Sequence, residues 1–478
     1  MSLTSTGDSE THSEPGHGGG LGGGRRRRAL RPVLWRLHFF SGLLAGPIIL
    51  SMALTGIVFV WNPQIESAIY SKALTAVSGA PDQPLAQQVR AAKATHPDYE
   101  VTAIVPAAPG AVGGEETTAV TLAPPDPETN RFGQDAGVTT VYVDPGSARV
   151  TGQIVEAKRP DEWIRNLHSN WRVGQKSWLE PLSETAASWV LVSLFTGLYL
   201  FWPRSRRAWA QAARLSPRRP SRARWRTVHT TMGVVLLGAL LVQIGTGLTW
   251  TRFAGKWVDA AQAVVSAEAP TLSTDLAAAG PSATGQQRAE GEAGKRSTSL
   301  ANVDTVMATV ADVGLSAPME ITPPAEPRQA WTVASIDDRW PIDTATVAIA
   351  PASGAVIDRV TWGDQPLLGK ITTLAINYHT GTLFGLANQI FLTLFAAAVI
   401  VMIVSGYRMW WHRRPAGVLG APPRAGPLLR VVPIPLLIGF AVLMVLLPML
   451  GVSFLIFLLV ERLVRLARHR PAAATPAD

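Results

Sequence analysis

The sequence predicts an integral membrane protein: a core of four long helices plus a C-terminal apolar hairpin, with two extracytoplasmic α+β domains. Three observations lead to this fold class: apolar segments of spanning length, an uneven distribution of charge, and local sequences that occur twice. Hydrophobic residues make up 47% of the 478 residues, and the mean hydropathy is positive although the loops are polar. Because a helix needs about 20 apolar residues to cross a bilayer, the apolar segments are interpreted as membrane spans.

The apolar segments form two related pairs. The first runs from Trp35 to Trp61 and the third from Trp225 to Trp250; both begin Trp-Arg, contain a histidine soon afterwards, and have glycines four and eighteen residues past that histidine. Before the second and fourth segments, NLHSNWRVG (166–174) matches NYHTGTLFG (377–385), each with a glycine six residues after its histidine. The chain is therefore predicted to be an internal duplication of one unit: helix, large loop, helix.

The apolar segments and the loops between them divide the chain into eleven parts. They are a disordered cytoplasmic tail (1–30), a first span (31–62), a first outer domain (63–165), a second span (166–203), an Arg-rich cytoplasmic loop (204–224), a third span (225–252), a second outer domain (253–370), a fourth span (371–412), a cytoplasmic loop (413–430), the apolar hairpin (431–462) and a cytoplasmic tail (463–478).

Charge predicts the orientation. Residues 204–226 carry nine arginines and no acidic residue, whereas 28 of the 34 acidic residues lie in 62–182 and 251–370. The positive-inside rule then places the amino terminus and the Arg-rich loop in the cytoplasm, and the two large loops outside. The net charge of +9 is thereby explained by topology and by contact with anionic membrane lipid, not by nucleic-acid binding.

Each outer loop is long enough to hold a folded domain. In the first, a helix is expected at Leu85 to Ala94, followed by strands with a turn at Asp144-Pro145-Gly146. In the second, a helix over 300–314 precedes a similar pair of strands. Residues 101–135 and 270–298, rich in Gly, Pro, Ala and Glu, are interpreted as insertions or linkers.

The apolar stretch 431–460 permits two topologies. A single spanning helix would carry the basic end of the stretch to the outside, against the charge rule. A helical hairpin that turns near Pro448 would return these basic residues to the cytoplasm, and we favour it.

Histidine is the main candidate cofactor ligand, because the chain has no cysteine and so lacks disulfides and thiolate sites. His38 and His229 begin helices on the cytoplasmic side, while His168 and His379 lie at the outer ends of the second and fourth spans. Neutral imidazole is a good axial ligand for iron. Each pair is therefore predicted to hold one haem iron, which gives two haems, because a core of about 30 Å is too wide for one haem to serve both faces.

Gly42 and Gly233 each follow a cytoplasmic-side histidine by one helical turn and are expected to clear room for the porphyrin plane. The competing interpretation of a lone histidine near a helix end is an interfacial residue hydrogen-bonded to backbone or lipid. Recurrence of two pairs in repeated local sequence favours ligation. For His412, between Trp411 and Arg413, the interfacial interpretation is preferred.

Other sources of redox chemistry are missing from the sequence. It contains no dinucleotide fingerprint, flavin motif, hydrolase triad or zinc signature, and no side chain is assigned a catalytic role. Electrons are therefore expected from a cytoplasmic partner or from a quinol. The remaining histidines lie in polar segments and are interpreted as surface residues: His12, His17, His96 and His469.

Several motifs resemble the PepSY-associated transmembrane helix family. They are Leu-His…Gly…Leu-Thr-Gly in the first span, Thr-Gly-Leu-Tyr-Leu-Phe-Trp-Pro-Arg ending the second, His-Thr-Gly-Thr-Leu-Phe-Gly before the fourth, and the strand turn Asp-Pro-Gly-Ser-Ala. The resemblance covers roughly residues 30–465. It implies a four-helix core, PepSY domains on the outer side, bound haem and, for some members, reduction of ferric siderophores at the bacterial inner membrane. One departure is the segment 107–135, which interrupts the first PepSY-like domain.

These observations favour a multi-pass protein of the bacterial cytoplasmic membrane with haem b, which passes electrons outward to a ferric siderophore or similar chelate for iron acquisition. Two alternatives belong to other classes. In a non-enzymatic metal or siderophore permease, the same histidines would bind a transported ion. In a PepSY-based regulator, the outer domains would bind a peptidase.

The orientation can be tested with reporter fusions. An enzyme that is active only outside the cytoplasm should be active when fused after Gly146 or Gly354 and silent when fused near Leu215, because the acidic loops lie outside and the Arg-rich loop inside. The measurement is the reporter activity of bacterial cells that express each fusion. The reverse pattern would overturn the orientation and with it the direction of electron flow.

Overall fold

A computed structural model provides the structure of the chain. It describes residues 21–109, 116–125, 128–129, 135–170, 179, 181–202, 221–264, 270–276, 300–315, 317–422 and 432–468. Residues 1–20, most of the Arg-rich loop (203–220), residues 423–431 and the tail after 468 lie outside these residues. The prediction of a disordered tail is wrong for 21–30, which form the start of a helix.

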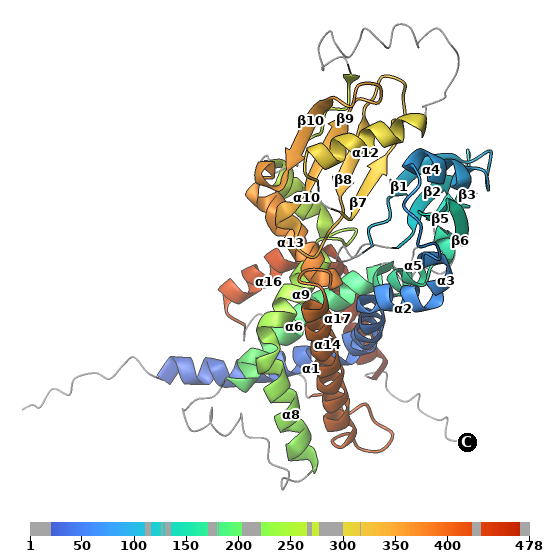
Figure 1. Cartoon of the computed structure of the whole chain (residues 1–478). Coiled ribbons are helices and arrows are strands. Elements are labelled where there is room, and N and C mark those ends of the chain that lie inside the picture. Colours follow the sequence, from blue (N-terminus) through green and yellow to red (C-terminus); the bar gives the residue numbers. More distant parts are fainter. Residues whose placement is uncertain are drawn as a thin grey trace, which may run out of the picture.

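Among the described residues, three helices are long and apolar enough to cross a membrane, and two bent helix pairs would raise the number of spans to five if each pair crosses once. The three helices are α1 (Leu21–Val60), of which Leu30–Val60 is the apolar part, α6 (Pro181–Phe201) and α14 (Leu386–Trp411). The predicted third span is divided into α8 (Ser221–Val235) and α9 (Leu237–Leu248), which bend by 61°. Glycines at 233 and 238 flank the bend and weaken the helix there. The bundle lies below the outer domain in Figure 1.

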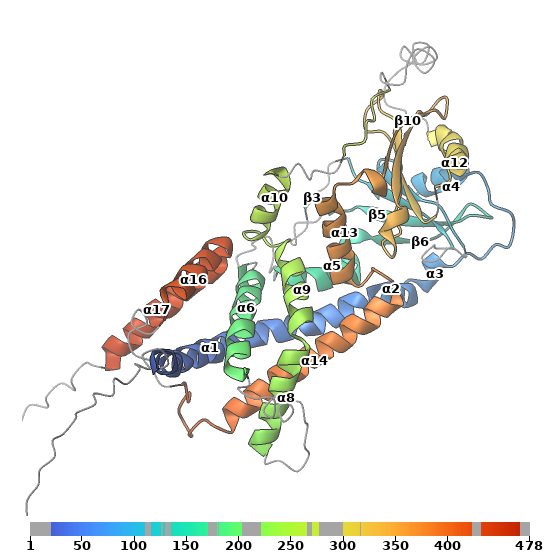
Figure 2. The ribbon, with the colours of Figure 1, turned by 90° about the vertical axis from the view of Figure 1, so that its left-hand side faces the viewer.

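The C-terminal apolar stretch forms α16 (Ile434–Leu446) and α17 (Pro448–Arg468), which bend by 118° beside Pro448, where the hairpin was expected to turn. With 13 residues, α16 is about 20 Å long and too short to cross a core of about 30 Å. An ion pair of 2.5 Å joins Glu461 on α17 to Arg36 on α1. Figure 2 shows both helices at one edge of the bundle, where Trp189 on α6 donates to Ser453 Oγ on α17 at 2.9 Å.

The part of the chain predicted to lie outside the cytoplasm, the outer sheet, is one continuous eight-stranded antiparallel sheet in the order β10-β9-β8-β7-β1-β2-β5-β6. Its strands are β1 (Glu100–Val105), β2 (Thr118–Ala123), β5 (Thr139–Asp144), β6 (Arg149–Val155), β7 (Met319–Thr322), β8 (Trp331–Ser335), β9 (Ala345–Ile349) and β10 (Val356–Thr361), while β3 (Glu128–Thr129) and β4 (Asp135–Ala136) form a separate pair. The two halves, predicted as separate domains, join at β1 and β7, where Ile104 lies opposite Ile321.

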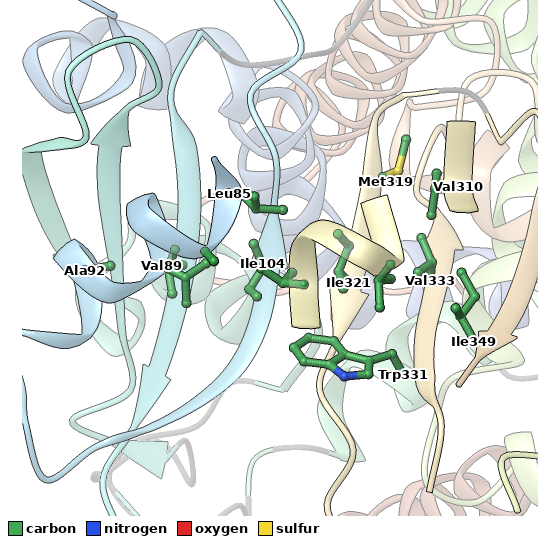
Figure 3. Close-up of a cluster of buried hydrophobic side chains, with 14 of the residues drawn as sticks. Leu85, Val89, Ala92, Ile104, Val310, Met319, Ile321, Trp331, Val333 and Ile349 are labelled. Carbon is green, nitrogen blue, oxygen red and sulfur yellow. The ribbon is translucent and has the colours of Figure 1, made fainter. Parts of the chain in front are cut away.

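Two helices, α4 (Leu85–Lys93) and α12 (Val303–Asp312), cover one face of this sheet, and the core beneath them is shared by both halves (Figure 3). Ile104, Ile321 and Trp331 are fully buried in it. Alternation of apolar and polar residues predicts strands that bury one face, but not which strands pair across two halves of a chain.

Two expectations about segments are corrected. Residues 101–135 are not simply an insertion, because they contain most of β1 and all of β2, and Val120 and Leu122 are fully buried. In 270–276, Leu276 is buried and Asp275 pairs with Gln329, so this piece packs on the sheet. The rest of 270–298 lies outside the described residues.

The spans also begin later than predicted on the outer side. Helix α6 begins at Pro181, and His168 lies before it on a π-helical turn (Asn166–Asn170) that follows α5 (Pro160–Arg165). The predicted fourth span is two helices, α13 (Leu367–Thr380) and α14. Gly381, at φ 91°, ends α13 in the left-handed conformation that favours glycine.

The remaining elements among the described residues are shorter. They are the helices α2 (Asn62–Ile69), α3 (Ser71–Leu74) and α10 (Gly255–Val264), and the 3-10 turns Glu156–Lys158, Leu300–Asn302, Pro341–Asp343 and Trp362–Asp364.

Continuity of the sheet has a testable consequence at the seam. An Ile321→Ala variant should lose about 2–5 kcal/mol of stability, because a buried side chain is removed, and amide protection should fall in β2 as well as in β7 and β8. Hydrogen exchange of the whole protein in detergent measures both. As a control, Ile342→Ala, at a side chain 42% exposed, should change stability by no more than about 0.5 kcal/mol. Full protection of β2 in Ile321→Ala would show that the halves unfold independently.

Candidate functional site: two histidine pairs

The pair predicted to lie on the cytoplasmic side is brought together by two helices. His38 lies on α1 and His229 on α8, and their ring centres are 6.0 Å apart with the planes at 79°. A metal–imidazole bond is about 2 Å long, so two rings on opposite sides of one metal have centres about 6 Å apart. The spacing of His38 and His229 therefore matches two axial ligands of one metal.

Hydrogen bonds fix the tautomer of this pair. His38 Nδ1 lies 3.0 Å from the carbonyl oxygen of Ser193, and His229 Nδ1 lies 3.0 Å from that of Met402. A carbonyl oxygen can only accept, so each Nδ1 carries the proton and donates. Each Nε2 then keeps a lone pair, which is the state that binds a metal.

Glycines on neighbouring helices allow these rings to approach. A methyl group at Gly197 on α6 would lie 2.9 Å from His38 Cε1, and one at Gly406 on α14 would lie 3.4 Å from His229 Cε1. The first distance is too short for a real contact. A larger residue at 197 would therefore push the His38 ring away from α6.

The outer-side pair is held in the same way from different elements. His168 Nδ1 lies 3.0 Å from Thr55 Oγ1 on α1, and His379 Nδ1, on α13, lies 2.9 Å from Thr246 Oγ1 on α9. Each hydroxyl donates its own proton to the carbonyl four residues earlier in its helix. It therefore accepts from Nδ1, and Nε2 again keeps its lone pair.

Glycine again lies beneath each outer ring. A methyl group at Gly56 would lie 3.3 Å from His168 Cε1, and one at Gly247 would lie 3.0 Å from His379 Cε1. The indole of Trp250 packs edge-on against His379, with ring centres 5.3 Å apart. Both outer rings are thus confined on several sides.

The same two-residue pattern lies beside all four histidines. A hydroxyl residue followed by glycine supplies the side-chain oxygen beside Nδ1 and the open space beneath the ring; at the cytoplasmic side these oxygens lie 3.3 and 3.4 Å from Nδ1. The four dipeptides are Thr55-Gly56, Thr196-Gly197, Thr246-Gly247 and Ser405-Gly406. The sequence interpretation did not assign these residues to the site. Their recurrence toward the end of each apolar segment was the signal available.

The outer histidines line one cavity of about 530 Å³ among α1, α6, α9 and α14. Most of its wall is apolar, and the charged residues on it are Arg165, Glu184 and Arg252. A volume of this size falls within the roughly 300–1,000 Å³ typical of sites for small organic ligands and cofactors. Both outer rings thus face a space large enough for a cofactor.

The predicted clearance glycines lie in more open surroundings. A methyl group at Gly42 would meet no atom within 4 Å, and one at Gly233 would come only to 4.0 Å from the sulfur of Met402. Neither glycine contacts a histidine ring. Their role beside a porphyrin stays a prediction.

The remaining described histidines lie elsewhere. His96 stacks on Tyr99 and is hydrogen-bonded through Nε2 to Gln153 Oε1 at 2.9 Å. His412 follows the last residue of α14 and belongs to neither pair. Among the described residues no group of three or more His, Asp or Glu side chains could hold a metal ion.

The outer sheet contacts the helix that carries His379 through the loop between β8 and β9. Asn377 on α13, two residues before His379, donates from Nδ2 to the carbonyl oxygen of Asp338 at 2.8 Å. Burial raises the pKa of the Asp338 carboxyl, while its hydrogen bond with Asn377 opposes this shift and the nearby charge of Asp337 adds to it. This contact ties the helix that carries His379 to the sheet.

Comparison with protein families gives a match over most of the chain. The family described as PepSY-associated TM region matches residues 35–413. The chain belongs to this family. It is a membrane protein, and the resemblance noted in its sequence is confirmed. The matched region includes all four paired histidines and ends before the C-terminal hairpin. No curated protein matches the chain.

The packing of the rings can be tested without a cofactor. Gly197→Ala should displace the His38 ring and lengthen its Nδ1 hydrogen bond to Ser193, because the new methyl group cannot lie 2.9 Å from Cε1. Gly42→Ala, on the same face of α1 as His38, should leave the ring in place. Structures of the two variants by electron cryo-microscopy are the measurement. An unmoved ring in Gly197→Ala would show that this glycine does not position His38.

Proposed function

We propose that this protein is an oxidoreductase of the bacterial inner membrane that binds two haems b and passes electrons outward to a ferric siderophore or similar chelate, as part of iron acquisition. Its amino terminus faces the cytoplasm, following the positive-inside rule. The electron donor is a cytoplasmic protein or a quinol. Reduction releases ferrous iron from the chelate on the outer side.

One observation carries the proposal. Four histidines on different elements each donate Nδ1–H to a neighbouring helix and keep Nε2 for a metal. A histidine that only lies at the membrane interface does not need a glycine beneath its ring or an oxygen that orients it. Here this arrangement occurs four times. Orientation of a ligating histidine by a hydrogen bond to its other nitrogen is typical of metal sites.

The residues present fit haem at both sites. His38 and His229 have the ring spacing of two ligands on one metal, and His168 and His379 line a mainly apolar cavity of about 530 Å³. When bound, haem supplies one-electron redox chemistry. The chain contributes four imidazoles oriented by hydrogen bonds, and the wall of the outer cavity is mostly apolar.

The recurrence of the contacts supports duplication as their origin. Histidine on the first helix of each half meets a Ser/Thr-Gly dipeptide on the second: His38 meets α6 and His229 meets α14. Histidine before the second helix meets the dipeptide on the first. We therefore infer that the two halves arose from one unit, each half contributing one ligand to each site.

The function is tested with the purified protein and with vesicles. The intact protein should show a Soret band and low-spin reduced spectra with two haems, and vesicles with reductant inside should reduce an outside ferric chelate. His229→Ala should lose one haem and slow formation of a ferrous-dye complex by at least about tenfold, because a lost axial ligand weakens binding at least as much as a lost supporting residue.

The control is His412→Ala, which removes a histidine that belongs to neither pair. It should keep both haems and the normal rate. A colourless, folded protein from haem-replete cells would exclude the proposal. Normal iron uptake by His229→Ala without any change in oxidation state would instead favour a permease.

A further inference from the structure

A buried acidic residue lies in the wall of the outer cavity. Glu184 is in the first turn of α6, its exposed fraction is 1%, and it lines the same space as His168 and His379. Most acidic residues of the chain lie in the outer loops. An acid inside a membrane helix costs free energy and usually has a partner or a role.

Only one of the two carboxylate oxygens of Glu184 has a hydrogen-bond partner among the described residues. Oε2 accepts from the backbone N–H of Phe253 at 3.1 Å, whereas Oε1 has no hydrogen-bond partner among the described residues. Two buried amides on α14 differ. Asn388 donates to the carbonyl of Tyr378 at 2.9 Å, and Gln389 donates to that of Val60 at 3.0 Å. Those amides bind elements together, but one backbone hydrogen bond does not require a carboxylate at 184.

The other charges on the cavity are better exposed to solvent or partnered. The side chain of Arg165 is 50% exposed and pairs with Asp161 at 3.4 Å, and the guanidinium of Arg252 lies over the ring of Phe253. Solvent screens an exposed charge, whereas a buried charge acts in a medium of low dielectric constant. The charge of Glu184 therefore contributes most to the electrostatic field inside the cavity.

We propose that Glu184 sets the redox potential of the outer site, by placing a negative charge beside a centre whose oxidised form carries one more positive charge than its reduced form. The charge stabilises the ferric form and so lowers the potential. The outer site thereby becomes a stronger one-electron reductant: its iron goes from ferrous to ferric as the chelated iron goes from ferric to ferrous. The inference rests on the proposed function and assigns Glu184 a tuning role.

Potentiometric titration of the purified protein, followed by visible spectroscopy, is the test. The two couples are assigned with His38→Ala and His168→Ala, each expected to retain one haem. Glu184→Gln should raise the outer midpoint potential enough to change the ratio of reduced to oxidised haem at least tenfold, which is about 59 mV for a one-electron couple. The inner couple should not move.

Two further variants separate charge from packing. Glu184→Asp keeps the charge and should restore most of the low potential. Glu461→Gln removes an acid on α17 that pairs with Arg36, and it should leave the outer couple unchanged.

The outcomes distinguish this inference from the proposed function. If the wild-type protein binds no haem, the proposed function fails. If both low-spin haems are present and Glu184→Gln leaves the outer potential unmoved, only the role of Glu184 fails. Loss of the outer haem from Glu184→Gln, with Glu184→Asp normal, would mean that Glu184 holds the site together, and would also overturn the proposal.

Discussion

The architecture of the helical core depends on the hydrogen bond from each histidine Nδ1–H to a neighbouring helix. No water is available within the bilayer, so this donor must find its acceptor inside the protein. The acceptor is within reach only if the helices approach closely, and glycine beneath the ring permits that approach. Four such contacts fix α1 against α6 and α8 against α14 on one side, and bring Thr55 and Thr246 to the outer histidines on the other.

The outer sheet imposes a second constraint on the same helices. Along the chain, each half of the sheet follows one membrane helix and precedes another. The two halves of the sheet join at β1 and β7. The continuous sheet therefore limits how far apart the two halves of the bundle can lie on the outer side. Contact between Asn377 and Asp338 extends this constraint to the helix that carries His379. The outer pair thus lines a cavity within the bundle, while the helix that carries His379 also contacts the sheet.

The sequence was sufficient for some levels of this structure and not for others. Hydropathy gave the spans because a bilayer demands about 20 apolar residues, and repeated local sequence singled out the four histidines. It did not give their partners on other helices, because Thr196-Gly197 and His38 are neighbours only in the folded chain. Pairing of β1 with β7 was missed for the same reason. The break before α14 was hidden because the apolar pattern continues through α13, whereas Gly381 ends that helix locally.

On the proposed function, a low potential at the outer site would oppose outward electron flow, because an electron leaving the inner site would move to a poorer acceptor. The membrane potential acts in the other direction. The outside of an energised membrane is positive, and moving one elementary charge across it is worth about 2.3 kcal/mol per 100 mV. On the same proposal, an electron crossing from the His38–His229 pair toward the His168–His379 pair would gain part of this energy, which would offset the unfavourable difference between the sites. On the proposed function, Glu184 would thus convert the membrane potential into reducing power outside the cell.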